Sequence, residues 1–257
     1  MAEEKGQFPT EVIDLPSKGY FYPKDNPLSS GQVEIKYMTA REEDILTSTN
    51  LIQKGTVLDK LLEALVVSDV NLDDILIGDK NAIMVASRVL AYGKEYIFEF
   101  TDPSSGETRD ESVDLTKLED KKLDFKKFEK NKNEFDFELP ACKKVIIFKL
   151  LTQREEKQIA SELKAMKKLT KESGIDPEIT TRLKASIIAI DGNRERNTIN
   201  KFVDTEFLSV DSFAYRTYLT SITPDIDLSY LVELDNGEVE EVAVPITATF
   251  FWPSVIR

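Results

Sequence analysis

The chain has 257 residues, 41% of them hydrophobic, which is enough to bury one large core or two ordinary ones. Its 47 acidic and 34 basic residues give a net charge of −13, which disfavours binding to nucleic acid or to an anionic membrane surface. The chain has no histidine and one cysteine, Cys142, which excludes an internal disulfide, a histidine-dependent catalytic triad and a cysteine–histidine zinc site. This cysteine usage is typical of a reducing compartment.

No targeting or cofactor motif is recognisable. The first residues, MAEEKGQFPT, lack the basic start and apolar stretch of a signal peptide, and no apolar run approaches the roughly 20 residues of a membrane span. The sequence has no Walker A, G-x-G-x-x-G or G-x-S-x-G motif, and its acidic turns LDNGE and DGNRE lack the regular acid spacing of a calcium loop. We therefore expect no cofactor and no metal, and we expect Cys142 to be a small buried residue.

The first predicted strand is VEIKYM at 33–38, because β-branched and aromatic residues favour extended backbone. It runs directly into Thr39-Ala-Arg-Glu42, the pattern of a capping box, in which the Thr and Glu side chains satisfy free backbone N–H groups at a helix start. Apolar residues then recur at i, i+3, i+4 and i+7 over 56–67, which predicts an amphipathic core helix.

A third helix is predicted over 79–92, with Asp79 as a candidate cap and Gly93 as a stop signal. The stretch KEYIFEFTDPSSGETRDESVDL follows and reads as a β-hairpin, since Asp-Pro-Ser-Ser-Gly has the composition of a turn. The next segment, TKLEDKKLDFKKFEKNKNEFD, is highly charged and is interpreted as a solvated connector or an exposed helix.

The same elements recur in the same order in the second half. VIIFKLL at 145–151 predicts a strand, and Thr152-Gln-Arg-Glu155 repeats the capping box. Two helices are predicted from PEITTRLKASIIAI at 177–190 and from DSFAYRTYLTSI, and LSYLVELDNGEVEEVAVPI predicts a second hairpin. Upstream, the acid-Leu-Pro sequence at 14–16 is repeated at 138–140.

This repetition predicts an α+β fold with an internally duplicated unit of strand, capped helix, amphipathic helices and a terminal β-hairpin. The first repeat, with an N-terminal strand and loop extension, is expected at 1–118. A charged connector is expected at 119–133, and the second repeat with an aromatic C-terminal tail at 134–257. The repeated Thr-x-Arg-Glu is then interpreted as helix capping by Thr39, Glu42, Thr152 and Glu155. The alternative is a hydrolase in which Glu42/Glu43 and Glu155/Glu156 act as paired carboxylates, one of each with a raised pKa.

Two aromatic stretches exceed what the repeat requires. They supply the candidate partner-binding residues Tyr20, Phe21, Tyr22, Pro23, Phe250, Phe251, Trp252 and Pro253. Aromatic residues are over-represented in interface hot spots, so we expect these stretches to contact a partner. On that interpretation, deleting 247–257 removes partner binding and leaves the body folded. The other interpretation is that the tail covers the protein's own core as a final strand.

The sequence resembles the baseplate hub subunits of T-even-type tailed phages. The resemblance rests on DLPSKGYFYP at 14–23, KYMTAREEDIL at 36–46 and the terminal FFWP, and it extends over most of the chain. It implies a non-enzymatic structural protein of the virion, located in the tail baseplate and made in the host bacterial cytoplasm. The implied partners are other baseplate hub or wedge proteins, with possible self-association and no nucleic acid or membrane. An alternative is an assembly factor or chaperone for the hub that is absent from the mature virion.

Some members of that family carry paired cysteines in the first hairpin, which suggests a metal ribbon. Here the corresponding stretch is FTDPSSGETRDE and contains no cysteine. The resemblance therefore implies that turn residues, in place of a metal, hold this hairpin together.

Overall fold

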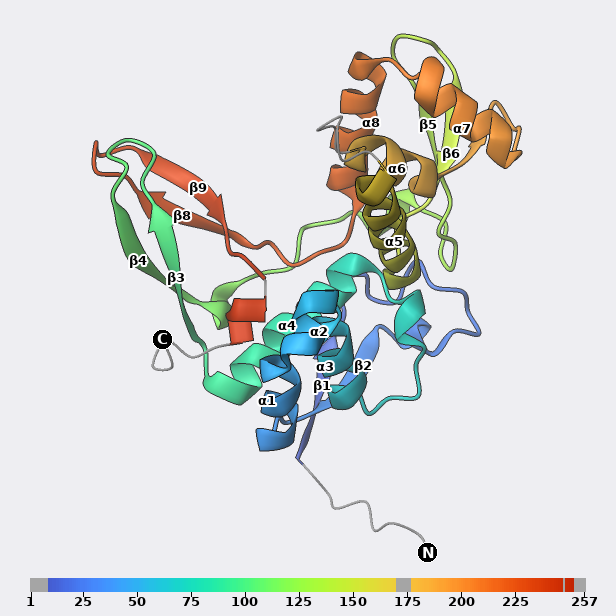
Figure 1. Ribbon diagram of the computed structural model, residues 1–257. Coiled ribbons are helices and arrows are strands. Elements are labelled where there is room, and N and C mark those ends of the chain that lie inside the picture. Colours follow the sequence, from blue (N-terminus) through green and yellow to red (C-terminus); the bar gives the residue numbers. More distant parts are fainter. Residues whose placement is uncertain (1–8, 170–176, 247, 252–257) are drawn as a thin grey trace, which may run out of the picture.

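The computed structural model describes residues 9–169, 177–246 and 248–251, and its fold is α+β, as predicted (Figure 1). A first lobe contains β1 (Thr10–Asp14), β2 (Gln32–Lys36), α1 (Ala40–Thr47), α2 (Thr49–Lys54), α3 (Val57–Leu65) and α4 (Ile77–Tyr92). A second lobe contains β5 (Phe135–Glu138), β6 (Val145–Phe148), α5 (Gln153–Leu169), α6 (Glu178–Ser186), β7 (Ile187–Ile190), α7 (Arg196–Thr205) and α8 (Ser209–Ile222).

Two antiparallel hairpins extend together to one side of the lobes (Figure 1). They are β3 (Glu95–Thr101) with β4 (Thr108–Asp114), and β8 (Ser229–Glu233) with β9 (Val239–Ala243). Their inner faces meet where the rings of Phe98 and Tyr230 lie 6.2 Å apart. We call these two hairpins the hairpin arm. Short 3-10 turns complete the fold: η1 (Pro27–Ser30), η2 (Leu72–Asp74), η3 (Leu115–Lys117), η4 (Phe125–Lys127) and η5 (Ala248–Phe251).

The two lobes repeat each other in strand pairing as well as in element order. In the first lobe β1 pairs antiparallel with β2, and Ile35 of β2 bridges Val66 just after α3. In the second lobe β5 pairs with β6, and Phe148 of β6 pairs with Ile187 just after α6. Each of these central strands ends one turn before a capped helix. The last helix of each lobe, α4 or α8, then leads into a hairpin.

In the second lobe, the structure differs from the sequence prediction at two points. The helix predicted over 177–190 ends at Ser186, and residues 187–190 form strand β7 instead. The run Ile-Ile-Ala-Ile is rich in β-branched residues and finds a partner in β6, so pairing overrides the helical period. Helix α7 was not predicted, although Ile199, Phe202 and Val203 have amphipathic helical spacing and are buried.

Packing also crosses the expected boundaries at 118 and 134. The connector is not freely solvated, because Phe125 and Phe128 pack their rings 5.9 and 5.6 Å from that of Phe21 in the first lobe. The hairpin of the second repeat packs against that of the first, and η5 returns to α4 of the first lobe (Figure 1). The chain therefore divides by packing into two lobes and a shared hairpin arm.

Candidate binding surfaces

A buried carboxylate holds the aromatic loop of the first lobe in place. Asp79, the third residue of α4, is fully buried and accepts hydrogen bonds from Ser17 N at 2.9 Å, Ser17 Oγ at 2.6 Å and the Tyr22 hydroxyl at 2.6 Å. The Tyr22 hydroxyl in turn accepts from Leu76 N at 2.8 Å. Burial raises the pKa of Asp79 to about 6, although the hydrogen bonds from Ser17 and Tyr22 act to lower it.

The second lobe has a carboxylate at the equivalent place. Asp211 is the third residue of α8, is fully buried, and accepts from Ala141 N at 2.7 Å and Cys142 N at 3.2 Å. In both lobes the donors follow directly after Leu-Pro, so the repeated sequence is a loop that presents N–H groups to the start of the last helix. Cys142 is only partly buried, which differs from the prediction of a buried residue.

Most of the predicted contact residues of the first aromatic stretch belong to the core. Phe21 is 1% exposed and Tyr22 is 3% exposed, so neither side chain offers a surface to a partner. Tyr20 is half-buried, and its hydroxyl donates to the Phe128 carbonyl at 3.0 Å. Only Pro23 is exposed. The expectation that this stretch supplies an aromatic contact is therefore wrong for Phe21 and Tyr22.

The second aromatic stretch is likewise part of the core where it is described. Phe250 and Phe251 are fully buried, the Phe250 ring lies 4.8 Å from that of Tyr96, and Arg88 Nε donates to the Phe250 carbonyl at 2.9 Å. The segment covers the protein's own core as a 3-10 turn and not as the strand considered above. Its removal would uncover Tyr96 and take an acceptor from Arg88, so we expect the 247–257 deletion to destabilise the first lobe instead of leaving the body folded. Trp252 and Pro253 lie outside the described residues.

The predicted capping box is complete at α1, and at α5 the contact of Glu155 with the Thr152 backbone N–H is present. Thr39 N and Oγ1 donate to Glu42 Oε2 at 2.9 and 2.6 Å, and Lys36 Nζ lies 2.7 Å from Glu42 Oε1. Thr152 N donates to Glu155 Oε2 at 2.9 Å, Thr152 Oγ1 donates to the same atom, and Lys149 Nζ lies 2.6 Å from Glu155 Oε1. The ion pair, from the lysine three residues before the capping Thr to the third helical residue, thus repeats along with the cap.

These contacts bear on the hydrolase alternative. Burial alone would raise the pKa of Glu42, but the hydrogen bonds from Lys36 and Thr39 outweigh it and hold that pKa below its usual value. Burial would also raise the pKa of Glu155, but the hydrogen bonds from Lys149 and Thr152 outweigh it and hold that pKa below its usual value. A general acid needs a raised pKa, so these two carboxylates have the shift opposite to the one that the alternative requires.

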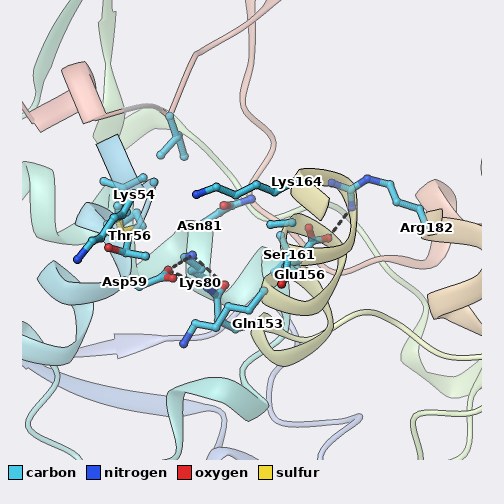
Figure 2. A pocket seen from close by; sticks show the side chains of 17 residues that line it. Lys54, Thr56, Asp59, Lys80, Asn81, Gln153, Glu156, Ser161, Lys164 and Arg182 are labelled. Atoms are coloured by element: carbon cyan, nitrogen blue, oxygen red, sulfur yellow. Dashed lines mark hydrogen bonds and ion pairs between the residues drawn. The ribbon is translucent and has the colours of Figure 1, made fainter. Parts of the chain in front are cut away.

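A pocket of about 800 Å³ lies between the lobes, lined by α2, α3 and α4 on one side and by α5 and α6 on the other (Figure 2). At its floor Gln153 is 6% exposed and binds across the boundary. Its amide donates to Asp59 Oδ1 at 2.7 Å, and Lys80 Nζ donates to both Asp59 Oδ1 at 2.9 Å and Gln153 Oε1 at 2.8 Å. On the other wall Arg182 pairs with Glu156 at 2.6 Å.

These polar groups join the two lobes. Two further ion pairs cross the same boundary, from Arg154 to Asp74 at 2.7 Å and from Lys157 to Asp73 at 2.6 Å. Because the polar groups of the pocket floor bind one another, the arrangement offers no nucleophile hydrogen-bonded to a base, which is what covalent catalysis would need. We interpret the pocket as the space left between two lobes that are joined by polar contacts.

The hairpin arm carries most of the net charge. Residues 95–114 contain seven acids and one arginine, and residues 229–243 contain five acids and no base, so the arm has a net charge of −11 of the total −13. Its outer surface is also partly apolar: Ile97 is 37% exposed, Leu231 66% and Val239 64%. In the register of β8 and β9, Leu231 pairs with Glu241 and Glu233 with Val239, which places both apolar residues on one face.

The two hairpin tips are clipped together by side chains. Asp102, which is fully buried, accepts from Ser104 N at 2.7 Å and from Asp235 N of the other hairpin at 2.8 Å. Arg109 Nη1 lies 3.2 Å from Asp102 Oδ2 and 2.8 Å from Asp235 Oδ1. Turn residues and a charge cluster thus hold the two hairpin tips together.

Neither a metal centre nor a known relative adds to this description. In the described part of the chain, no group of three or more Cys, Asp or Glu side chains is placed to hold a metal ion, and no helix has the length and apolar character to cross a bilayer. No protein-family model, curated protein or solved structure matches the chain.

Proposed function

We propose that this chain is a non-enzymatic structural subunit of a phage tail baseplate hub that is held in the assembly by its hairpin arm. The observation that carries the proposal is the surface of that arm. Leu231 and Val239 form an exposed apolar centre within an acidic rim, and the arm extends away from both lobes (Figure 1). An apolar centre surrounded by charge is the composition of a protein–protein interface.

The family assignment in this proposal rests on the resemblance at 14–23 and 36–46. Those residues turn out to have structural roles: Ser17 and Tyr22 bind Asp79, and Thr39 and Glu42 cap α1. The resemblance therefore concerns the way the fold is built, and the contact surface is assigned from exposure. The rim carries net negative charge, so its partner in the baseplate presents basic residues around an apolar patch.

The experiment is quantitative mass spectrometry of purified particles of the encoding phage, compared with the infected-cell lysate. A fixed small number of copies in each particle supports a hub subunit. Abundance in the lysate with none in particles would replace the proposal by its alternative, an assembly factor that leaves before the virion is complete.

The arm is tested in the same phage with Leu231→Glu combined with Val239→Glu. We expect the purified variant protein to keep its circular dichroism spectrum, because both side chains are exposed, and to be missing from particles. The matched control is Ile179→Glu on α6, where the side chain is 51% exposed but lies in the second lobe. Normal incorporation of the arm variant would show that the arm is not the contact.

A further inference from the structure

The first turn of α8 exposes three apolar side chains. Leu208, at the N-cap, is 51% exposed, Val210 is 57% exposed and Phe213 is 67% exposed. Positions 210 and 213 are three residues apart on a helix, so their side chains are neighbours on its surface. We call Leu208, Val210 and Phe213 the α8 face. Tyr215, which is 1% exposed, lies in the core, on the side of the helix away from Val210 and Phe213.

The first lobe has the same face, and there it is covered. Because Asp79 and Asp211 are both third residues of their helices, Leu76, Gly78 and Asn81 correspond to Leu208, Val210 and Phe213. All three contact the second lobe.

The contacts are close ones. Leu76 forms an isolated β-bridge with Thr152, and Asn81 Nδ2 donates to Asp225 Oδ1 at 3.1 Å. A Cβ added at Gly78 would lie 1.8 Å from the Pro224 carbonyl oxygen, so the backbone of the second lobe passes directly over this glycine. The start of the last helix is therefore the place where one unit of this fold packs against another.

We infer that the α8 face is the interface of a dimer, in which a second copy of this chain covers the face that the second lobe covers in the first repeat. In repeat proteins each unit packs on its neighbour through equivalent surfaces, and the terminal unit leaves one such surface uncovered. Here the uncovered surface is apolar, which is typical of a buried interface and not of a terminal cap.

The side chains of this face also determine how closely a second copy can approach. Val210 replaces Gly78, so a backbone cannot approach as closely as Pro224 does in the first repeat. Contact is made through apolar side chains instead, and the surface that best complements an apolar face is another copy of it. Two α8 faces packed together give a closed, two-fold symmetric dimer, the commonest form of homo-oligomer.

Electrostatics favours this face over the hairpin arm as the self-association surface. The only acid in α8 is Asp211, which is fully buried, and its only base is Arg216. Two α8 helices can therefore meet without bringing carboxylates of their own together, and the exposed Glu206, two residues before Leu208, is paired with Lys144 at 2.9 Å. Two hairpin arms, each with a net charge of −11, would repel each other.

The inference is independent of the baseplate proposal, because it concerns the purified chain alone. The experiment is sedimentation equilibrium of the full chain over a wide range of concentrations. We expect a monomer–dimer equilibrium for the wild type, and for Phe213→Glu a dissociation constant raised by about 100-fold or more, because a charge is then buried in an apolar contact. Ile52→Glu, at a 44% exposed apolar residue of α2, is the matched control and should dimerise like the wild type.

Hydrogen exchange at a low and a high protein concentration locates the contact. We expect residues 208–214 to gain protection at the high concentration, whereas the hairpin arm should not change. A wild type that stays monomeric, a Phe213→Glu variant that dimerises normally, or protection confined to the arm would each overturn the inference. Circular dichroism of Phe213→Glu checks that the fold is retained, which its exposed position leads us to expect.

Discussion

The two lobes use the same junction in different surroundings. In each, a loop after Leu-Pro presents N–H groups to a buried aspartate at the start of the last helix, and a Lys–Glu ion pair supports a capping box. In the first lobe the stretch 20–31 is inserted into this loop and brings the Tyr22 hydroxyl onto Asp79. In the second lobe Asp211 binds backbone N–H groups and has no tyrosine partner among the described residues.

This difference shows which contacts both junctions share and which contact, that of Tyr22 with Asp79, occurs in the first lobe. Backbone donors after Leu-Pro are common to both junctions, and in the second lobe the Cys142 thiol also bonds to Asp211. Tyr22 extends the same network to Leu76, which itself bridges Thr152 of the second lobe. In the first lobe, the hydrogen-bond network that fixes the loop therefore also reaches the contact with the second lobe. In the second lobe, Asp211 fixes only its own loop.

The largest expected difference between the two lobes comes from removing the buried aspartate of each. Asp79→Ala leaves a backbone N–H and two hydroxyls without an acceptor in the core, and we expect a loss of about 4 kcal/mol in the free energy of unfolding. Asp211→Ala leaves two N–H groups and should cost about 2 kcal/mol. Urea denaturation followed by circular dichroism measures both. Equal losses would mean that Tyr22 adds nothing to the junction.

The pH dependence of stability should differ between the lobes through Asp79. Its folded pKa of about 6 lies above the value near 4 of an unfolded aspartate, so the native state binds this proton more tightly. The stabilisation is complete below pH 4 and is lost as pH rises to about 6, by about 3 kcal/mol in total.

Urea titrations of the wild type and of Asp79→Asn at several pH values test this. Carboxylates with lowered pKa, such as Glu42 and Glu155, change stability in the opposite sense in both proteins, so the difference between the two isolates Asp79. We expect the difference to vary between pH 4 and 6 and to be constant above. A difference that does not vary with pH would contradict the raised pKa.

A substitution at Gly78 tests the contact that distinguishes the two last helices. Gly78→Val gives the first lobe the residue that the second has at 210, and its side chain would collide with the Pro224 carbonyl. We expect a loss of about 2 kcal/mol, within the usual cost of overpacking, and a larger radius of gyration by small-angle X-ray scattering as the lobes separate. Val210→Ala, at the exposed equivalent, should change stability by less than about 0.5 kcal/mol.

The smallest effect is expected at the capping boxes. Thr39→Ala and Thr152→Ala each remove a hydroxyl that binds the Glu three residues later, and each should cost about 1 kcal/mol. Similar values for the two would show that the repeated motif does the same work in both lobes. A negligible loss at one site, measured by thermal unfolding, would show that its ion pair, Lys36–Glu42 or Lys149–Glu155, is sufficient.

What could be predicted from the sequence was local. A capping box depends on two residues three apart in the sequence, so the Thr–Glu contact at both helix starts was predicted correctly without knowledge of the fold. The order of strand, helices and hairpin followed from the repeat. Strand β7 was missed because Ile187 and Ile190 fit a helical period, and only the partner strand β6 decides between the two.

The fate of the aromatic residues could not be predicted in this way. Consecutive aromatics suggest that alternate side chains are exposed, but Lys18 and Gly19 adopt positive φ and turn the chain, so Phe21 and Tyr22 are both buried. The burial of Phe250 depends on Tyr96, more than 150 residues earlier. The exposed residues of the hairpin arm and the α8 face carried no signal, because exposure depends on what the rest of the chain covers.

The position of Phe250 has a consequence for the order in which the molecule can fold as it is synthesised. The first lobe is made first, yet its core includes a ring from η5, near the other end of the sequence, and Arg88 on α4 donates one of its hydrogen bonds there. Phe21 likewise packs 5.3 Å from the ring of Phe135, which is synthesised more than 100 residues later. A nascent chain that has emerged only as far as β4 therefore has an incomplete core, and the N-terminal lobe reaches its native packing only after the ribosome has made Phe250.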